Sequence, residues 1–108
     1  MDPQRSGARE SDDKLEQVLV FLRARGDWIS SQITATGDAD EIEVRQVQEI
    51  IDRINKVLPG LEHKNRSLAK SLTELRDMCF SAKLARREGK YPQYFQYLRV
   101  ITQQLTSL

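Results

Sequence analysis

The chain has little of what disulfide-rich, metal-binding and membrane-spanning proteins require. Its 108 residues include one cysteine, one histidine, three prolines and five glycines, and aromatic residues make up only 6%. A single cysteine cannot form an internal disulfide and is typical of a reducing compartment. No apolar run approaches the roughly 18 residues that a transmembrane helix needs, and the first dozen residues contain no apolar signal-peptide core. We therefore expect an intracellular protein, cytoplasmic or nuclear, without a membrane span.

Catalytic and ligand-binding signatures are also missing. The sequence contains no glycine-rich nucleotide-binding motif, no phosphate-binding loop and no nucleophile elbow. His63 stands between two charged residues, as on a solvated helix face, and lies sixteen residues from Cys79, a separation that matches no metal-ligand spacing. Cys79 occupies an apolar position and is interpreted as a small core residue. We expect a non-enzymatic protein with no catalytic residue, no cofactor, no metal and no small-molecule substrate.

One regular apolar pattern dominates the middle of the chain. Twelve residues are separated alternately by three and four positions, and eleven of them are apolar: Val44, Val47, Ile51, Ile54, Leu58, Leu61, Asn65, Leu68, Leu72, Leu75, Cys79 and Ala82. Side chains at this spacing share one face of an α-helix, so the pattern is a heptad seam. A face this apolar must be covered by another helix, either from the same chain or from a partner.

Four helices are expected in a single domain over residues 11–108. Their approximate bounds are 12–34, 41–58, 61–89 and 92–108. Residues 1–10 mix Pro, Gly, Ser and charged residues with no large apolar residue after the first, which predicts a disordered tail. The predicted fold is all-α, a three- to four-helix bundle or coiled coil built on a central helical hairpin.

Turn-forming and capping residues indicate the helix ends. Gly37 follows the first helix, and Asp40 with Glu43 resembles a capping box at the start of the second. Gly89 ends the third helix, and Pro92 stands at the first position of the fourth, where proline is favourable. Inside the first helix, Gly26 marks either a close helix crossing or a break, and we favour an unbroken helix although glycine costs roughly 1 kcal/mol there.

Pro59 and Gly60 decide how the second and third helices are joined. Proline disfavours a helical conformation for the residue before it and removes a backbone donor, at about 3 kcal/mol inside a helix. In one structure the pair forms a tight turn, and the two helices fold back as a hairpin. In the other, one kinked helix continues with the pair on its outer side and the seam unbroken. The unbroken spacing favours the kink, whereas the Pro-Gly pair favours the turn, which we predict.

The third and fourth helices are predicted to provide the contact surface for a partner, because the second helix is too short to cover the third. The predicted interface residues are Leu68, Leu72, Leu75, Phe95, Leu98, Ile101 and Leu105. Asn65 is the polar residue of the seam. In a paired coiled coil it fixes register and strand number, whereas near the turn it is a half-exposed residue, and the sequence leaves both readings open.

A basic set follows at helical spacing: Lys83, Arg86, Arg87 and Lys90. Lys and Arg in the last turns of a helix complement its dipole, and they also offer contacts to an anionic partner. We expect an assembly subunit that oligomerises or joins a larger complex through its heptad-spaced faces. The alternative is a small protein that binds nucleic acid or an acidic partner through the Lys83–Lys90 face, although nucleic acid is disfavoured because stacking aromatics are not interleaved with the cations.

Overall fold

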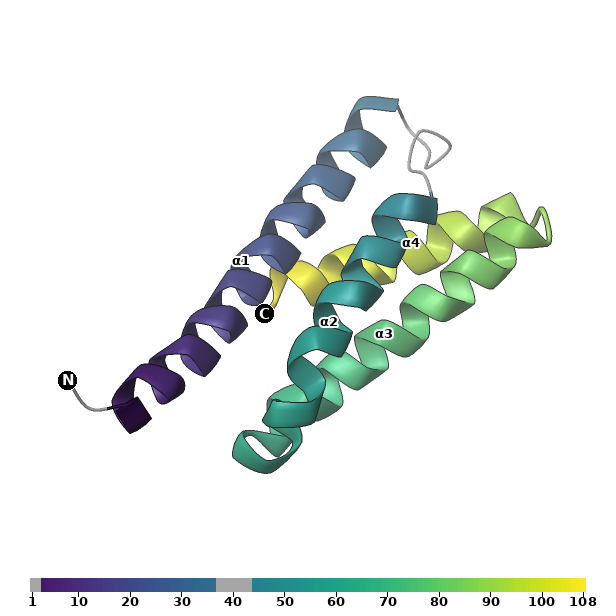
Figure 1. Cartoon of the computed structure of the whole chain (residues 1–108). Coiled ribbons are helices and arrows are strands. Elements are labelled where there is room, and N and C mark those ends of the chain that lie inside the picture. Colours follow the sequence, from purple (N-terminus) through teal and green to yellow (C-terminus); the bar gives the residue numbers. More distant parts are fainter. Residues whose placement is uncertain (1–2, 37–43) are drawn as a thin grey trace.

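The computed structural model consists of four α-helices, with no strand among the described residues (Figure 1). It describes residues 3–36 and 44–108, with side chains for residues 13–35 and 44–108. The helices are α1 (Pro3–Thr36), α2 (Val44–Lys64), α3 (Arg66–Arg87) and α4 (Tyr91–Thr106). The predicted all-α bundle built on a central helical hairpin is confirmed, and α2 and α3 form that hairpin.

The four helices form a closed ring of contacts in which each runs roughly opposite to its neighbours (Figure 1). α2 packs on α3, α3 on α4, and α4 returns to pack on α1. The contact between α1 and α2 is the smallest of the four. This up-and-down order is the usual result of short connections between amphipathic helices.

The seam of α2 and α3 forms the core of the bundle. Nine of its twelve residues are buried, Val44 and Leu68 are partly buried, and Asn65 is exposed. α4 adds its own buried stripe, Tyr94, Leu98, Ile101 and Leu105, and α1 contributes Val18, Leu22 and Ile29. Burying each large aliphatic side chain contributes about 1.5–3 kcal/mol, so this one cluster is the main source of stability.

Two ionisable groups lie in this core and titrate far from their usual range. Cys79 is a free, buried thiol, and its burial raises its pKa from 9.0 to about 12. Burial also raises the pKa of Tyr94 to about 12. The interpretation of Cys79 as a small core residue is confirmed, because its thiol is neutral at physiological pH and enclosed by apolar side chains.

The turn predicted at Pro59 and Gly60 is wrong, because α2 continues through both residues as far as Lys64. Pro59 and Gly60 are exposed, whereas Leu58 and Leu61 on either side of them are buried. Burying two leucines contributes about 3–6 kcal/mol, which equals or exceeds the roughly 3 kcal/mol that an internal proline costs. The seam spacing, which favoured a continuous helix at this point, was the better guide.

The chain instead reverses at Asn65, the single residue between α2 and α3. Its side-chain oxygen accepts a hydrogen bond from the backbone N–H of Leu68, at 3.1 Å, and so caps the start of α3. Asn65 is exposed and does not lie in a buried seam, so of the two readings left open by the sequence, an exposed residue near the turn is the one that fits the structure. A residue at a helix N-terminus satisfies backbone donors that lack partners, and asparagine is among the best at this task.

α1 passes unbroken through Gly26, where it crosses α4 closely. A Cβ atom at this position would lie 2.7 Å from the Cβ of Leu105 and 3.2 Å from Cγ2 of Thr106. Glycine is therefore required by the approach of the two helices rather than by a bend. Both the predicted unbroken helix and the close crossing are confirmed.

The helix ends differ from the sequence-based bounds. α1 begins at Pro3, whereas residues 1–10 were expected to form a disordered tail, and residues 1 and 2 lie outside the described residues. Extending a packed helix backwards avoids the cost of a new nucleus, which explains the extra turns. The turn at Gly37 and the capping box of Asp40 and Glu43 also fall outside the described residues. Gly89, at φ +74°, follows the end of α3 as predicted.

Candidate binding surfaces

Most of the residues predicted to contact a partner are covered by the chain itself. Leu72, Leu75, Leu98, Ile101 and Leu105 are fully buried. Leu68 and Phe95 are partly buried and pack against the same cluster. The assignment of these residues to an external interface is corrected, because α4 folds back over α3 and supplies the cover that a partner was expected to provide.

A different part of α3 exposes large apolar side chains. Phe80 and Leu84 lie one helical turn apart on the face of α3 that points away from the core, and they are 48% and 55% exposed. With Val44 of α2 they line a shallow hollow whose remaining described lining residues are Lys83, Arg86 and Arg87. We call these six residues the α3 patch. Exposed apolar side chains grouped in this way mark interaction sites more often than isolated ones do.

The basic residues near the end of α3 do not act as one cluster. Lys83 donates a hydrogen bond to Oε1 of Gln48 and lies over the ring of Phe80. Lys90 forms an ion pair with Glu88, with their charged atoms 2.9 Å apart. The guanidinium of Arg86 lies over the rings of two tyrosines, 4.8 Å from the centre of Tyr91 and 5.3 Å from that of Tyr94. Its position is therefore fixed by stacking.

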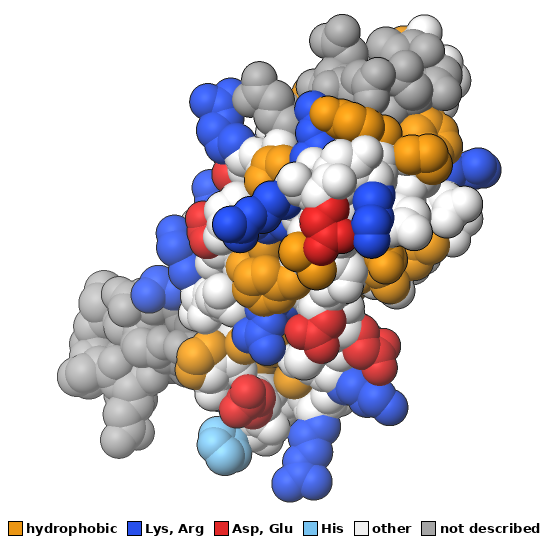
Figure 2. Space-filling view, turned by 90° about the vertical axis from the view of Figure 1, so that its right-hand side faces the viewer, with side chains coloured by type: hydrophobic (Ala, Val, Ile, Leu, Met, Phe, Trp, Pro, Cys, Tyr) orange, Lys and Arg blue, Asp and Glu red, His pale blue; other side chains and the backbone are white. Residues whose placement is uncertain are grey.

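Arg87 differs from these three, because it makes no hydrogen bond, ion pair or ring contact with the described residues. It is exposed beside Leu84 in the α3 patch. No acidic side chain is among the described residues that line the patch. Figure 2, which views the molecule from the α3 side, shows apolar side chains exposed between Lys and Arg side chains. The α3 patch therefore combines apolar area with positive charge.

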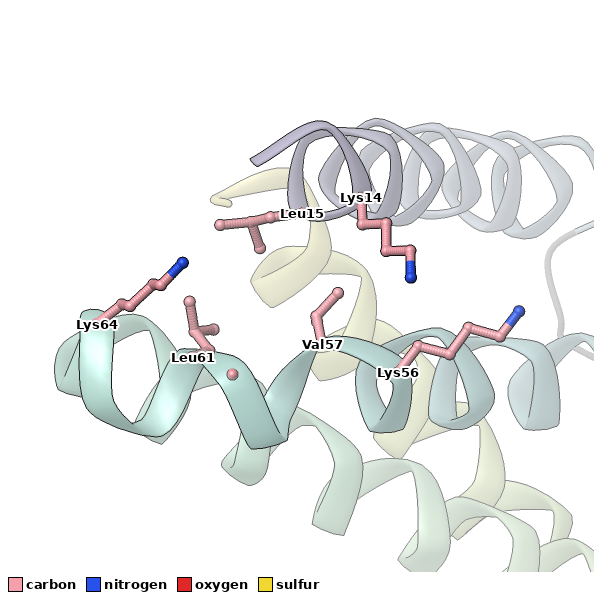
Figure 3. Close-up of a pocket in the computed structure, with 7 residues that line it drawn as sticks. Lys14, Leu15, Lys56, Val57, Leu61 and Lys64 are labelled. Atoms are coloured by element: carbon pink, nitrogen blue, oxygen red, sulfur yellow. The ribbon is translucent and has the colours of Figure 1, made fainter. Parts of the chain in front are cut away.

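A second hollow lies between α1 and α2, at the end of the bundle that is opposite to the α3 patch along α2. Its described lining residues are Lys14, Leu15, Lys56, Val57, Gly60, Leu61 and Lys64 (Figure 3). A neighbouring hollow shares Lys14, Lys56 and Val57 and adds Gln17, Val18 and Arg53. We call the two together the α1–α2 groove. No sequence pattern predicts this groove, because its cations come from two helices about forty positions apart and no local spacing connects them.

No three potential metal ligands gather among the described residues. His63 is exposed near the end of α2, whereas Cys79 is enclosed in the core, so these two groups do not share a site. Within residues 3–36 and 44–108, no helix combines the length and the apolar composition that crossing a bilayer requires.

The described part of the chain is thus a four-helix bundle with two surface sites that are both cationic and partly apolar. Comparison with protein families, with curated proteins and with solved structures finds no significant match to this chain.

Proposed function

We propose that this protein is a non-enzymatic interaction subunit that joins a larger complex by binding an acidic, amphipathic helical segment of another protein at the α3 patch. The observation that carries the proposal is the pair of half-exposed apolar side chains, Phe80 and Leu84, placed among cations with no acidic lining residue. Apolar anchors surrounded by charges of one sign favour a partner that has matching apolar side chains and the opposite charge.

The same observation favours a different protein over a second copy of this chain. A symmetric dimer through the α3 patch would bring Lys83, Arg86 and Arg87 close to their own copies, and like charges in an interface cost several kcal/mol. The heptad seam, which suggested self-assembly, is used within the chain. We therefore favour a hetero-complex over a homo-oligomer.

Nucleic acid is a poorer match to this surface. Lys83 and Lys90 already have partners within the chain, and Arg86 is stacked on two tyrosines, so Arg87 is left as the cation most available for a phosphate. Affinity for nucleic acid depends on the number of phosphates neutralised, and one or two contacts give weak binding. We place the role inside the cell, in the cytoplasm or nucleus, because a lone unpaired cysteine suits a reducing compartment.

The proposal is tested by selecting peptides from a random phage-displayed library on the immobilised protein and measuring their affinity by fluorescence anisotropy. We expect the selected peptides to be acidic, with Leu or Phe at helical spacing. The Leu84→Asp variant should bind them at least tenfold more weakly, the usual loss when an interface anchor is removed. Val20→Asp is the matched control, because Val20 is equally exposed but lies on α1, outside the α3 patch.

Four results would contradict the proposal. Selection of basic or purely polar peptides would remove the charge argument. Equal weakening by Leu84→Asp and Val20→Asp would show that the α3 patch is not the binding site. Tighter binding of duplex DNA than of any selected peptide, with a steep salt dependence, would favour the nucleic-acid alternative. Light scattering over a concentration series should give the mass of a monomer, and a dimer that Leu84→Asp dissociates would indicate self-assembly.

A further inference from the structure

The α1–α2 groove has cations on both of its sides. Lys14 extends from α1 and Lys56 from α2 into the same space between the two helices (Figure 3). Lys64 stands at the end of α2, and Arg53 lines the adjoining part of the groove. No Asp or Glu is among the described residues that line either part. Positive charges gathered in this way repel one another, and an anionic occupant relieves that repulsion.

The floor of the groove is apolar. Leu15 and Val18 face it from α1, and Val57 and Leu61 from α2, in each case at the three- or four-residue spacing of one helix face. Leu15 and Val57 are only partly buried. A purely polar anion would leave this apolar area in water, whereas a ligand with both an apolar and an acidic side would cover it.

α4 contacts α1 farther along that helix than the lysines of the groove, with Leu105 beside Gly26. The backbone oxygen of Leu108, which follows α4, accepts a hydrogen bond from Nε of Arg23. Lys14 lies nine residues farther toward the start of α1, or about 13 Å at the rise of an α-helix. α1 rests on α2 through the smallest helix contact in the bundle, and the two adjoining hollows lie between these helices.

The length of the groove matches that of a short helix. From Arg53 to Lys64 it follows eleven residues of α2, about 16 Å or three helical turns. We infer that the α1–α2 groove is a second docking site, which takes a three-turn, acidic, amphipathic helix of a partner protein with its apolar side on the floor and its carboxylates on the lysines. Val44 of the α3 patch and Lys64 lie twenty residues apart, about 30 Å along α2, so the protein joins two such segments.

The test uses a fluorescent twelve-residue helical peptide with Leu at three- and four-residue spacing and Glu at the flanking positions. Amide NMR spectra of the full chain, recorded during titration, show where this peptide binds. We expect shifts at Lys56, Val57 and Lys64, and we expect them to persist in the Leu84→Asp variant. This inference therefore does not depend on the α3 patch, whose occupancy is reported separately by Phe80 and Leu84.

Charge reversal provides the second measurement. In the Leu84→Asp background, Lys14→Glu with Lys56→Glu should weaken the peptide about tenfold. The control, Lys70→Glu with Arg99→Glu, changes the net charge equally at exposed residues outside both sites and should leave the affinity within twofold. Circular dichroism of each variant establishes that the bundle is intact.

Other occupants are distinguished by parallel titrations. The inference is overturned if a peptide with Lys in place of Glu shifts the same signals at the same concentration, or if inorganic polyphosphate saturates them more tightly than the acidic peptide does. It is also overturned if vesicles containing phosphatidylserine displace the acidic peptide from the groove. Shifts confined to Phe80 and Leu84 would leave the proposed function standing and remove the second site.

Discussion

The two faces of α3 carry similar side chains and have opposite surroundings. Leu72 and Leu75 belong to the heptad seam and are fully enclosed by α2 and α4. Phe80 and Leu84 lie off the seam, and about half of each side chain is in contact with water. Hydrophobicity alone does not separate the two pairs. The difference teaches that a residue becomes part of the core when it repeats in register with apolar positions on neighbouring helices, and that an apolar residue outside this register is free for a partner.

The same contrast separates the two sides of α1. Toward α4 it packs closely enough to exclude a methyl group at Gly26. Toward α2 it makes the smallest helix contact in the bundle and leaves the α1–α2 groove open. The side of a helix that is tightly covered sets the stability of the bundle, and the loosely covered side is available for binding.

Truncating one leucine on each face of α3 gives the largest expected effect. Leu75→Ala should lower the free energy of unfolding by about 2–5 kcal/mol, because it removes buried methyl groups and leaves a cavity. Leu84→Ala, the same change at an exposed position, should alter it by less than about 0.5 kcal/mol. Chemical denaturation followed by circular dichroism measures both. Equal losses would mean that Leu84 is covered in solution, and the α3 patch would then have to be given up.

A pair of glycines sharpens the comparison between covered and open helix surfaces. Gly26→Ala should destabilise the protein by about 1–3 kcal/mol, because the new methyl group meets α4 and must push the two helices apart. Gly60→Ala meets nothing within 4 Å and should stabilise it by about 0.5–1 kcal/mol, since alanine is the better helix former. Thermal unfolding of the two variants shows whether each substitution raises or lowers the stability of the protein. A stabilising Gly26→Ala would show that α1 and α4 are not in close contact.

The smallest expected effect is the alkaline pH dependence of the buried thiol. The folded-state pKa of Cys79 is raised to about 12, above its unfolded value. Its contribution is therefore fully present below pH 8 and declines as pH rises from about 9 toward 12, because only the unfolded chain then releases the proton. The expected loss between pH 7 and pH 9.5 is below about 1 kcal/mol. Denaturation at both pH values measures it, and Cys79→Ala should flatten the slope.

Some structural features can be predicted from the sequence, each for its own physical reason. The seam spacing correctly predicted which residues of α2 and α3 share a face, because helical geometry fixes that locally. It also indicates that the helix continues past Pro59, against the local preference of the Pro-Gly pair for a turn. Asn65 looked like a register residue because its position fits the heptad. Only the location of the chain reversal shows that it is a cap.

The α3 patch and the α1–α2 groove are much harder to predict from local sequence patterns. Phe80 and Leu84 lie outside the seam, and whether α4 or water covers them depends on the direction in which α4 returns. The lysines of the α1–α2 groove are remote in sequence, and no periodic pattern relates Lys14 to Lys56. Residues that meet through packing leave no local signature.

The order of residues by itself determined that this chain forms helices, which stripe of each helix is apolar, and that its lone thiol belongs inside. Those properties follow from the 3.6-residue turn and from the transfer of apolar side chains out of water, both of which act within one segment. The tertiary structure decided which helix covers each apolar stripe and that the chain reverses at Asn65. It also decided that cations from two helices distant in sequence share one groove. These outcomes depend on the total packing of four helices, because burying Leu58 and Leu61 outweighs the local preference of proline for a turn.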